Sequence, residues 1–153
     1  MRKNPARIGT LLIAAALAFA TLGWQGNTHR AVLVDAAPFV LYVRVITQAM
    51  QGEMPLDRAV FFLTVNLAGN VAVFVPLGFC LHFSLPPSIR RLTLVTLIGA
   101  AFSTALELGQ LTLPGRTTAI DDVLLNTLGT AIGSALAALV VRRQEKRHER
   151  RTA

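Results

Sequence analysis

The chain has 153 residues, of which 53% are hydrophobic and only 15% are charged, and its mean hydropathy is +0.54. This composition leaves too little polar surface to cover a soluble globule of this size, which indicates that the chain folds in lipid. The formal charge of +7 would also fit a nucleic-acid-binding protein, but the basic residues gather at the ends of apolar runs, so no nucleic-acid partner is needed to explain them.

The first apolar run extends from Ile8 to Trp24 behind three basic residues, and as a helix it would be about 26 Å long, enough for a thin bilayer. A cleavable signal peptide is the alternative, because Ala18-Phe19-Ala20 resembles a small-x-small cleavage site. We favour a retained anchor, since the run continues to Trp24 and tryptophan is common at membrane interfaces. Both interpretations place residue 25 outside the cytoplasm.

The next segment, from Gln25 to Arg58, is apolar over Ala31 to Met50 but contains Asp35, Pro38 and Arg44. A charged residue at the centre of a bilayer costs about 2.5 to 3.5 kcal/mol on insertion scales. We therefore expect an interfacial helix here rather than a crossing.

Three further apolar runs each have about the 20 residues that a crossing requires: Ala59–Phe83, Leu92–Leu111 and Ala119–Val141. Pro86-Pro87 should end the second helix, and Pro114-Gly115 should form the turn after the third. The predicted fold is an all-α integral membrane bundle of about four transmembrane helices plus the interfacial helix. We divide the chain into an N-terminal anchor and extracytoplasmic segment (1–58), a transmembrane core (59–141) and a basic cytoplasmic tail (142–153).

The basic residues predict the orientation of this bundle. In a four-span arrangement, eleven of the 15 Lys and Arg residues fall on the side of the two termini, and the other four are Arg30, Arg44, Arg58 and Arg116. The positive-inside rule makes the first side cytoplasmic. We expect a multi-pass protein of the bacterial inner membrane with both termini in the cytoplasm, whose tail is attracted to anionic lipid.

Seven polar residues interrupt the last three spans, and all of them fall in the halves predicted to be extracytoplasmic: Asn66, Asn70, Glu107, Gln110, Asp121, Asp122 and Asn126. Within three pairs the spacing is three or four residues, so each pair shares one helical face. Three polar faces are thus placed to converge.

Glu107 is the strongest single pointer to a functional site, because an ionisable group inside a membrane helix usually faces the bundle interior or a water-filled cavity. Arg116 is its expected partner. The same residues would also fit structural cross-helix bonding, and carboxylates such as Asp121 are favoured in a first helical turn by the helix dipole.

Other signals are weak. The three histidines lack ligand-like spacing and Cys80 is a single cysteine, so we expect no metal site, and no nucleotide-binding motif or other cofactor signature is present. Ser103 has no histidine partner and is interpreted as a small interhelical residue. Gly129 and Gly133 form a small-xxx-small face on which helices can approach closely.

Three motifs in order resemble those of the VanZ-like family: Asn70-Val-Ala-Val-Phe-Val-Pro-Leu-Gly78-Phe, then Glu107-Leu-Gly-Gln110, then Gly115-Arg116 with Asp121-Asp122-Val-Leu-Leu-Asn126-Thr-Leu-Gly129-Thr-Ala-Ile-Gly133. The resemblance covers about residues 66 to 137. It implies a small membrane protein of a family in which some members are linked to teicoplanin-type glycopeptide resistance and no biochemical activity is established.

The resemblance also implies which polar residues are characteristic of the family: Asn70, Glu107, Gln110, Arg116, Asp122 and Asn126. Asn66 and Asp121 are secondary candidates that rest on their position in the spans alone. One departure is Ala119, where many members carry an acidic residue. A function that needs that carboxylate would have to use Asp121 instead.

Three functions follow from these residues. The first is a non-catalytic envelope protein that binds a lipid or a lipid-linked cell-wall precursor in an outward-facing polar cleft and contributes to glycopeptide tolerance. The second is an intramembrane enzyme with Glu107 and Asp122 as an acid and base pair. The third is an accessory subunit that docks a partner helix on Gly129 and Gly133; the oligomeric state is not predicted.

Overall fold

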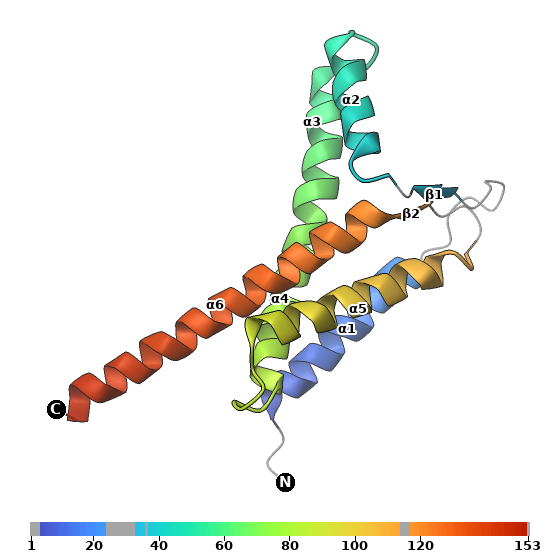
Figure 1. Ribbon diagram of the computed structural model, residues 1–153. Coiled ribbons are helices and arrows are strands. Elements are labelled where there is room, and N and C mark those ends of the chain that lie inside the picture. Colours follow the sequence, from blue (N-terminus) through green and yellow to red (C-terminus); the bar gives the residue numbers. More distant parts are fainter. Residues whose placement is uncertain (1–3, 24–32, 36, 114–116, 153) are drawn as a thin grey trace.

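The computed structural model describes residues 4–23, 33–35, 37–113 and 117–152. Within these residues, six α-helices, one π-helical segment and two short strands follow one another: α1 (Pro5–Leu22), β1 (Leu33–Asp35), α2 (Val40–Met50), α3 (Leu56–Leu63), η1 (Thr64–Ala68), α4 (Gly69–Ser84), α5 (Leu92–Gln110), β2 (Thr117–Ala119) and α6 (Ile120–Thr152). Figure 1 shows their arrangement.

In the described part of the chain, four helical segments are long and apolar enough to cross a membrane: Pro5–Leu22, Leu56–Ser84, Leu92–Gln110 and Ile120–Thr152. The second consists of α3, η1 and α4 in direct succession. These segments confirm the predicted all-α membrane bundle with four spans. They fit a multi-pass membrane protein, and each boundary lies within a few residues of its predicted position except the end of α6.

The start of α1 is bonded to the end of α4. Asn4 caps α1 by accepting from the Ala6 N–H, and its Nδ2 donates to the Phe83 carbonyl at 3.2 Å. Arg7 Nε donates to the Ser84 carbonyl at 3.2 Å, and the Thr10 and Ser84 hydroxyls are 2.8 Å apart. Because α4 ends where α1 begins, the spans alternate in direction, and the start of α1 and the end of α6 lie at the same end of the bundle (Figure 1).

The most extensive contact in the bundle is between α4 and α6, and glycine makes it possible. A methyl group at Gly129 would collide with the Val71 carbonyl oxygen, one at Gly133 with the Val75 carbonyl oxygen, and one at Gly78 with the Thr130 carbonyl oxygen. The close approach predicted for Gly129 and Gly133 is therefore present, with α4 of the same chain as the partner. This occupancy leaves neither glycine available to dock the helix of another subunit.

A small apolar cluster joins α1 to the rest of the bundle. Leu17 is buried with Phe74, Leu77 and Leu106, which come from α4 and α5. In lipid there is no hydrophobic driving force between helices, so such a cluster stabilises through van der Waals packing. The packing gives α1 a structural role in the bundle.

The segment after α1 differs from the predicted interfacial helix. Its helix, α2, begins only at Val40, and Leu33–Asp35 instead form β1, which pairs in parallel with β2. Figure 1 shows α2 and α3 side by side, as a hairpin that projects from the rest of the bundle. The sequence does not predict these strands, because three residues are too few to show the alternation of apolar and polar side chains that is typical of a strand.

The helix α6 also differs from its prediction, because it continues beyond Val141 to Thr152. The basic tail is thus a helical extension whose side chains are exposed, and no break separates it from the last span. Glu145 and Glu149 alternate with basic residues at helical spacing there, which favours a solvated helix.

We predict that Gly133→Ala lowers the thermal midpoint of the purified protein in detergent by about 5 °C, since overpacking against a backbone carbonyl costs about 1 to 3 kcal/mol. Gly69→Ala is the matched control, because a methyl group there meets no atom within 4 Å. Equal midpoints for the two variants would show that α4 and α6 are not in close contact.

Candidate functional site

The first two turns of α6 carry polar side chains that bond to α4 and α5. Asp122 accepts a hydrogen bond from Asn70 on α4, with 2.5 Å between Nδ2 and Oδ1. The two residues are 52 positions apart in the chain, and the carboxylate is half-buried. The contact of α4 with α6 at Gly129 and Val71 brings these side chains together.

One turn further along α6, Asn126 bonds to α5. Its Nδ2 donates to the Ser103 hydroxyl at 2.9 Å, and both residues are buried. The amide oxygen of Asn126 is buried and has no hydrogen-bond partner among the described residues. A buried acceptor without a donor costs about 1 to 3 kcal/mol, which marks Asn126 as a place where a ligand or water would be favoured.

Glu107 and Gln110 lie on the same face of α5 and are both buried, with 5% and 6% of their surface exposed. Glu107 Oε2 accepts a hydrogen bond from the backbone N–H of Ala119 at 3.2 Å, so the carboxylate holds the chain just before α6. Leu111 N–H donates to the Glu107 carbonyl at the end of α5, and Leu113 N–H donates to the Gln110 carbonyl in the turn that follows. The Glu107 carboxylate thus connects the end of α5 to the residue that precedes α6.

Asp121 points away from this group toward α2. Its Oδ1 accepts a hydrogen bond from the backbone N–H of Phe39 at 2.7 Å. Phe39 precedes α2 with a φ of 63°, which is uncommon for a residue with a side chain, and the carboxylate therefore compensates for strained backbone. Asp121 consequently serves as an anchor for the α2–α3 hairpin rather than as part of the bonds to Asn70 and Ser103.

Tyr42 on α2 lies near Asp121 and Asp122. It is 6% exposed, and its ring centroid is 6.0 Å from that of Phe39. Burial raises the pKa of Tyr42 to about 12, and the nearby negative charges of Asp122 and Asp121 add to the rise. The phenol therefore stays protonated at physiological pH and provides a hydroxyl donor next to Asp122.

Asn66, which is predicted to share a helical face with Asn70, bonds to the backbone of its own helical segment. It lies in the π-helical segment η1, and its Nδ2 donates to the Phe62 carbonyl at 2.8 Å. A π-helical turn leaves irregular backbone bonding, and side-chain donors can satisfy it. The structure thus separates Asn66 from Asn70, although π-helical turns are frequent near functional sites.

The predicted convergence of three helical faces is therefore present: α4 provides Asn70, α5 provides Ser103, Glu107 and Gln110, and α6 provides Asp122 and Asn126. We call this group the polar cluster. Arg116 and the turn at Pro114-Gly115 lie outside the described residues, so the proposed ion pair of Arg116 with Glu107 stays a prediction.

The sequence does not predict two of these residues as functional: Ser103 within the polar cluster and Tyr42 beside it. Its pattern predicts Ser103 as a small interhelical residue, although Ser103 precedes Glu107 by four and Gln110 by seven residues, a spacing that places all three on one helical face. Tyr42 had no such signal, because only the fold of the hairpin brings α2 to the start of α6.

The cluster consists of amides, carboxylates and hydroxyls, which suit hydrogen bonding to a polar ligand. Among the described residues there is no group of three or more His, Cys, Asp or Glu side chains arranged to hold a metal ion. The chemistry available here is donation by amides and hydroxyls and acceptance by carboxylates.

We predict that the single tyrosine titrates near pH 12 in the native protein, as measured by tyrosinate absorbance, and near pH 10 after denaturation. Asp122→Asn should lower the native midpoint but leave it above 10, because burial is the larger cause. Since the folded pKa is the higher one, this group's contribution to stability is lost as pH rises from about 10 to about 12, and Tyr42→Phe should remove that loss. A native midpoint near 10 would show that Tyr42 is exposed.

We also predict that Ser103→Ala destabilises the protein by about 1 to 2 kcal/mol, because it leaves the buried Asn126 amide without its acceptor. The double variant Ser103→Ala, Asn126→Leu should recover part of this loss, since both polar partners are then absent. Thermal unfolding in detergent measures both effects, and Thr104→Val on the exposed face of α5 is the control. Additive single and double effects would contradict a direct bond.

Comparison with known proteins identifies the family. No curated protein and no solved structure matches the chain. A family model described as VanZ/LLP1 matches residues 8–141, which include most of α1 and the whole polar cluster and extend beyond the motifs between residues 66 and 137. This match covers most of the chain, and the protein accordingly belongs to the VanZ/LLP1 family.

Proposed function

We propose that this VanZ-like membrane protein binds the polar headgroup of an envelope lipid or a lipid-linked cell-wall precursor at the polar cluster. The observation that carries the proposal is the buried Asn126 amide oxygen without a partner among the described residues, next to buried Glu107 and Gln110. A buried polar group in a membrane helix costs free energy unless it makes a hydrogen bond. The unbonded Asn126 oxygen therefore favours binding of a ligand that donates a hydrogen bond to it.

The proposed ligand carries hydroxyl or amide groups. Asp122 and Glu107 would accept hydrogen bonds from it, and the Asn126 oxygen would accept one more. Asn70 and Ser103 hold Asp122 and Asn126 in place through the bonds of 2.5 and 2.9 Å. Arg116, which follows α5 in the sequence, would contact a phosphate or carboxylate of the same ligand.

The distribution of basic residues supports a position for the cluster in the outer leaflet. One end of the bundle holds the start of α1 with Arg7, the loop before α5 with Arg90 and Arg91, and the basic last part of α6. The start of α6, which carries Asp122 and Asn126, lies at the other end (Figure 1). With the positive end in the cytoplasm, the cluster faces the side on which cell-wall precursors are used. Binding of such a precursor at the polar cluster would link this protein to glycopeptide tolerance, since these drugs act on precursors on the outer side of the membrane.

An intramembrane acid and base pair has weaker support. Glu107 Oε2 accepts from the Ala119 backbone and Asp122 Oδ1 accepts from Asn70, so one oxygen of each carboxylate already has a structural bond. Binding without turnover is the simpler use of groups held in this way. Turnover of a bound lipid would nevertheless be visible in the experiment below.

We predict that the full chain, purified in mild detergent, retains an envelope lipid that mass spectrometry identifies, and that Glu107→Gln with Asp122→Asn lowers its amount by about tenfold. Glu53→Gln with Asp57→Asn is the matched control, because it makes the same chemical changes at exposed positions just before α3 and in its first turn. Equal lipid in both double variants would remove the polar cluster from the explanation. Conversion of added labelled lipid to a new product would favour the enzyme.

In cells, the same comparison tests the link to resistance. Expression of the wild type should raise the teicoplanin concentration that inhibits growth, and the Glu107→Gln, Asp122→Asn variant should not, at equal membrane abundance. Tolerance that persists in this variant would separate the phenotype from the cluster.

A further inference from the structure

A second polar site lies at the opposite end of the bundle, where the basic residues gather. A hollow of about 410 Å³ is lined by residues of α4, the loop before α5, the start of α5 and α6: His82, Arg90, Leu92, Ala135, Ala138, Leu139 and Arg142. Along α6, Arg142 is about 30 Å from Asp122, at 1.5 Å per residue. This hollow is therefore separate from the polar cluster.

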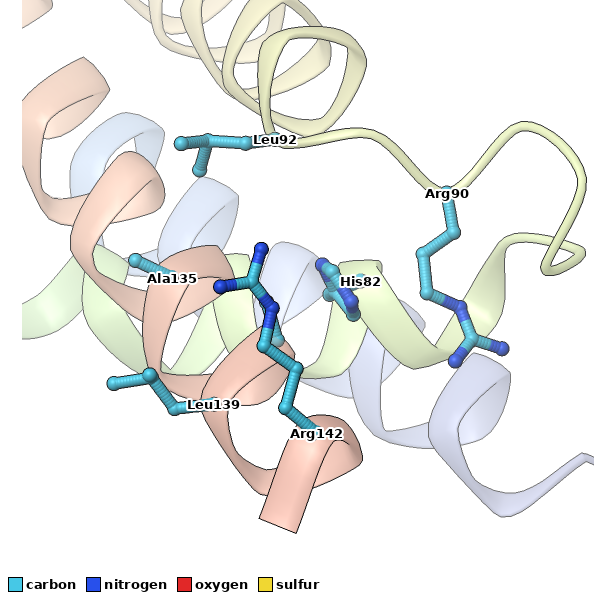
Figure 2. A pocket seen from close by; sticks show the side chains of 7 residues that line it. His82, Arg90, Leu92, Ala135, Leu139 and Arg142 are labelled. Carbon is cyan, nitrogen blue, oxygen red and sulfur yellow. The ribbon is translucent and has the colours of Figure 1, made fainter. Parts of the chain in front are cut away.

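The hollow combines cationic groups with apolar walls. Figure 2 shows His82 between Arg90 and Arg142, with Ala135 and Leu139 on α6 beside them. None of the seven lining residues is acidic. The lining thus offers two guanidinium groups and has no carboxylate among its seven residues to neutralise them, which favours an anionic ligand.

Two of these side chains are held in place by neighbouring groups. His82 is 4% exposed, and its Nδ1 is 2.9 Å from the Ser134 hydroxyl on α6. Arg90 Nε and Nη2 donate to the Leu85 carbonyl at 3.4 and 3.3 Å, and its guanidinium carbon is 5.5 Å from the Phe83 ring centroid. A guanidinium has five N–H donors, so Arg90 keeps donors for a ligand after these contacts.

The apolar walls indicate what kind of anion fits. Leu92 and Leu139 are each 48% exposed, and they lie on helices whose outer faces are apolar and long enough to cross a membrane. A ligand with an anionic head and apolar chains would place its head among Arg90, His82 and Arg142 and its chains along α5 and α6. A soluble phosphate would leave this apolar surface uncovered.

We propose that this hollow binds the phosphate headgroup of an anionic phospholipid from the leaflet that contacts the basic end of the bundle. Basic pockets between transmembrane helices on the cytoplasmic side suit such headgroups. The two arginines bind the phosphate, His82 bonded to Ser134 forms the floor, and the leucines contact the acyl chains. The bound lipid joins the α4–α5 loop to α6 at this end of the bundle.

The test measures binding of phosphatidylglycerol, phosphatidylcholine with the same acyl chains, and inorganic phosphate to the full chain in detergent by native mass spectrometry. We expect the wild type to prefer phosphatidylglycerol, and Arg90→Gln with Arg142→Gln to weaken that binding by about 30-fold, from about 1 kcal/mol per arginine. Ala138→Phe, which fills the hollow and keeps the charge, should weaken it as well.

The matched control is Arg91→Gln with Arg143→Gln, which removes the same charge at the adjacent exposed positions. This control should stay within about threefold of the wild type, since neither Arg91 nor Arg143 lines the hollow. An equal loss in both double variants would overturn the site in favour of diffuse attraction. Equal binding of the two lipids, or displacement of phosphatidylglycerol by inorganic phosphate at equal concentration, would overturn the lipid assignment.

Discussion

The close contact between α4 and α6 is the constraint on which the other features depend. At Gly78, Gly129 and Gly133 the two helices approach until backbone carbonyl oxygens occupy the space of a side chain. Lipid offers no hydrophobic force to hold helices together, so this packing and the hydrogen bonds beside it must do so. The same approach places Asn70 next to Asp122, and the polar cluster therefore exists only because the backbones touch.

The helix α6 connects two chemically different ends of the molecule. Its first turns carry the Asp122 carboxylate, which bonds to α4, and the Asn126 amide, which bonds to α5. At the other end of its span, Arg142 lines the hollow together with His82 and Arg90. Hydrogen-bond acceptors dominate at one end and cations at the other. This distribution suits hydrogen-bond donors at one end of the bundle and anionic groups at the other.

The α2–α3 hairpin shows how a short segment depends on distant residues. Asp121 at the start of α6 bonds to the backbone of Phe39, whose left-handed conformation begins α2, and Tyr42 is buried nearby. The π-helical segment η1 then joins α3 to α4. Irregular backbone at two places is therefore found close to the polar cluster, where Asn66 and Asp121 satisfy the backbone groups that regular helices would pair among themselves.

The sequence by itself determined the four spans, their alternation, and the helical faces of Asn70, Glu107 and Asp122, because hydropathy and helical spacing are local properties that survive in any membrane fold. It also determined the family through motifs of fixed order. Only the tertiary structure decided that Gly129 and Gly133 contact α4, and that Asn66 and Asp121 bond to backbone groups instead of joining the polar cluster. It also decided that Ser103 bonds to Asn126, that Tyr42 lies near Asp122 and that His82 lines the hollow. These assignments depend on which helices pack together and how closely, and periodicity within one helix carries no information about its neighbour.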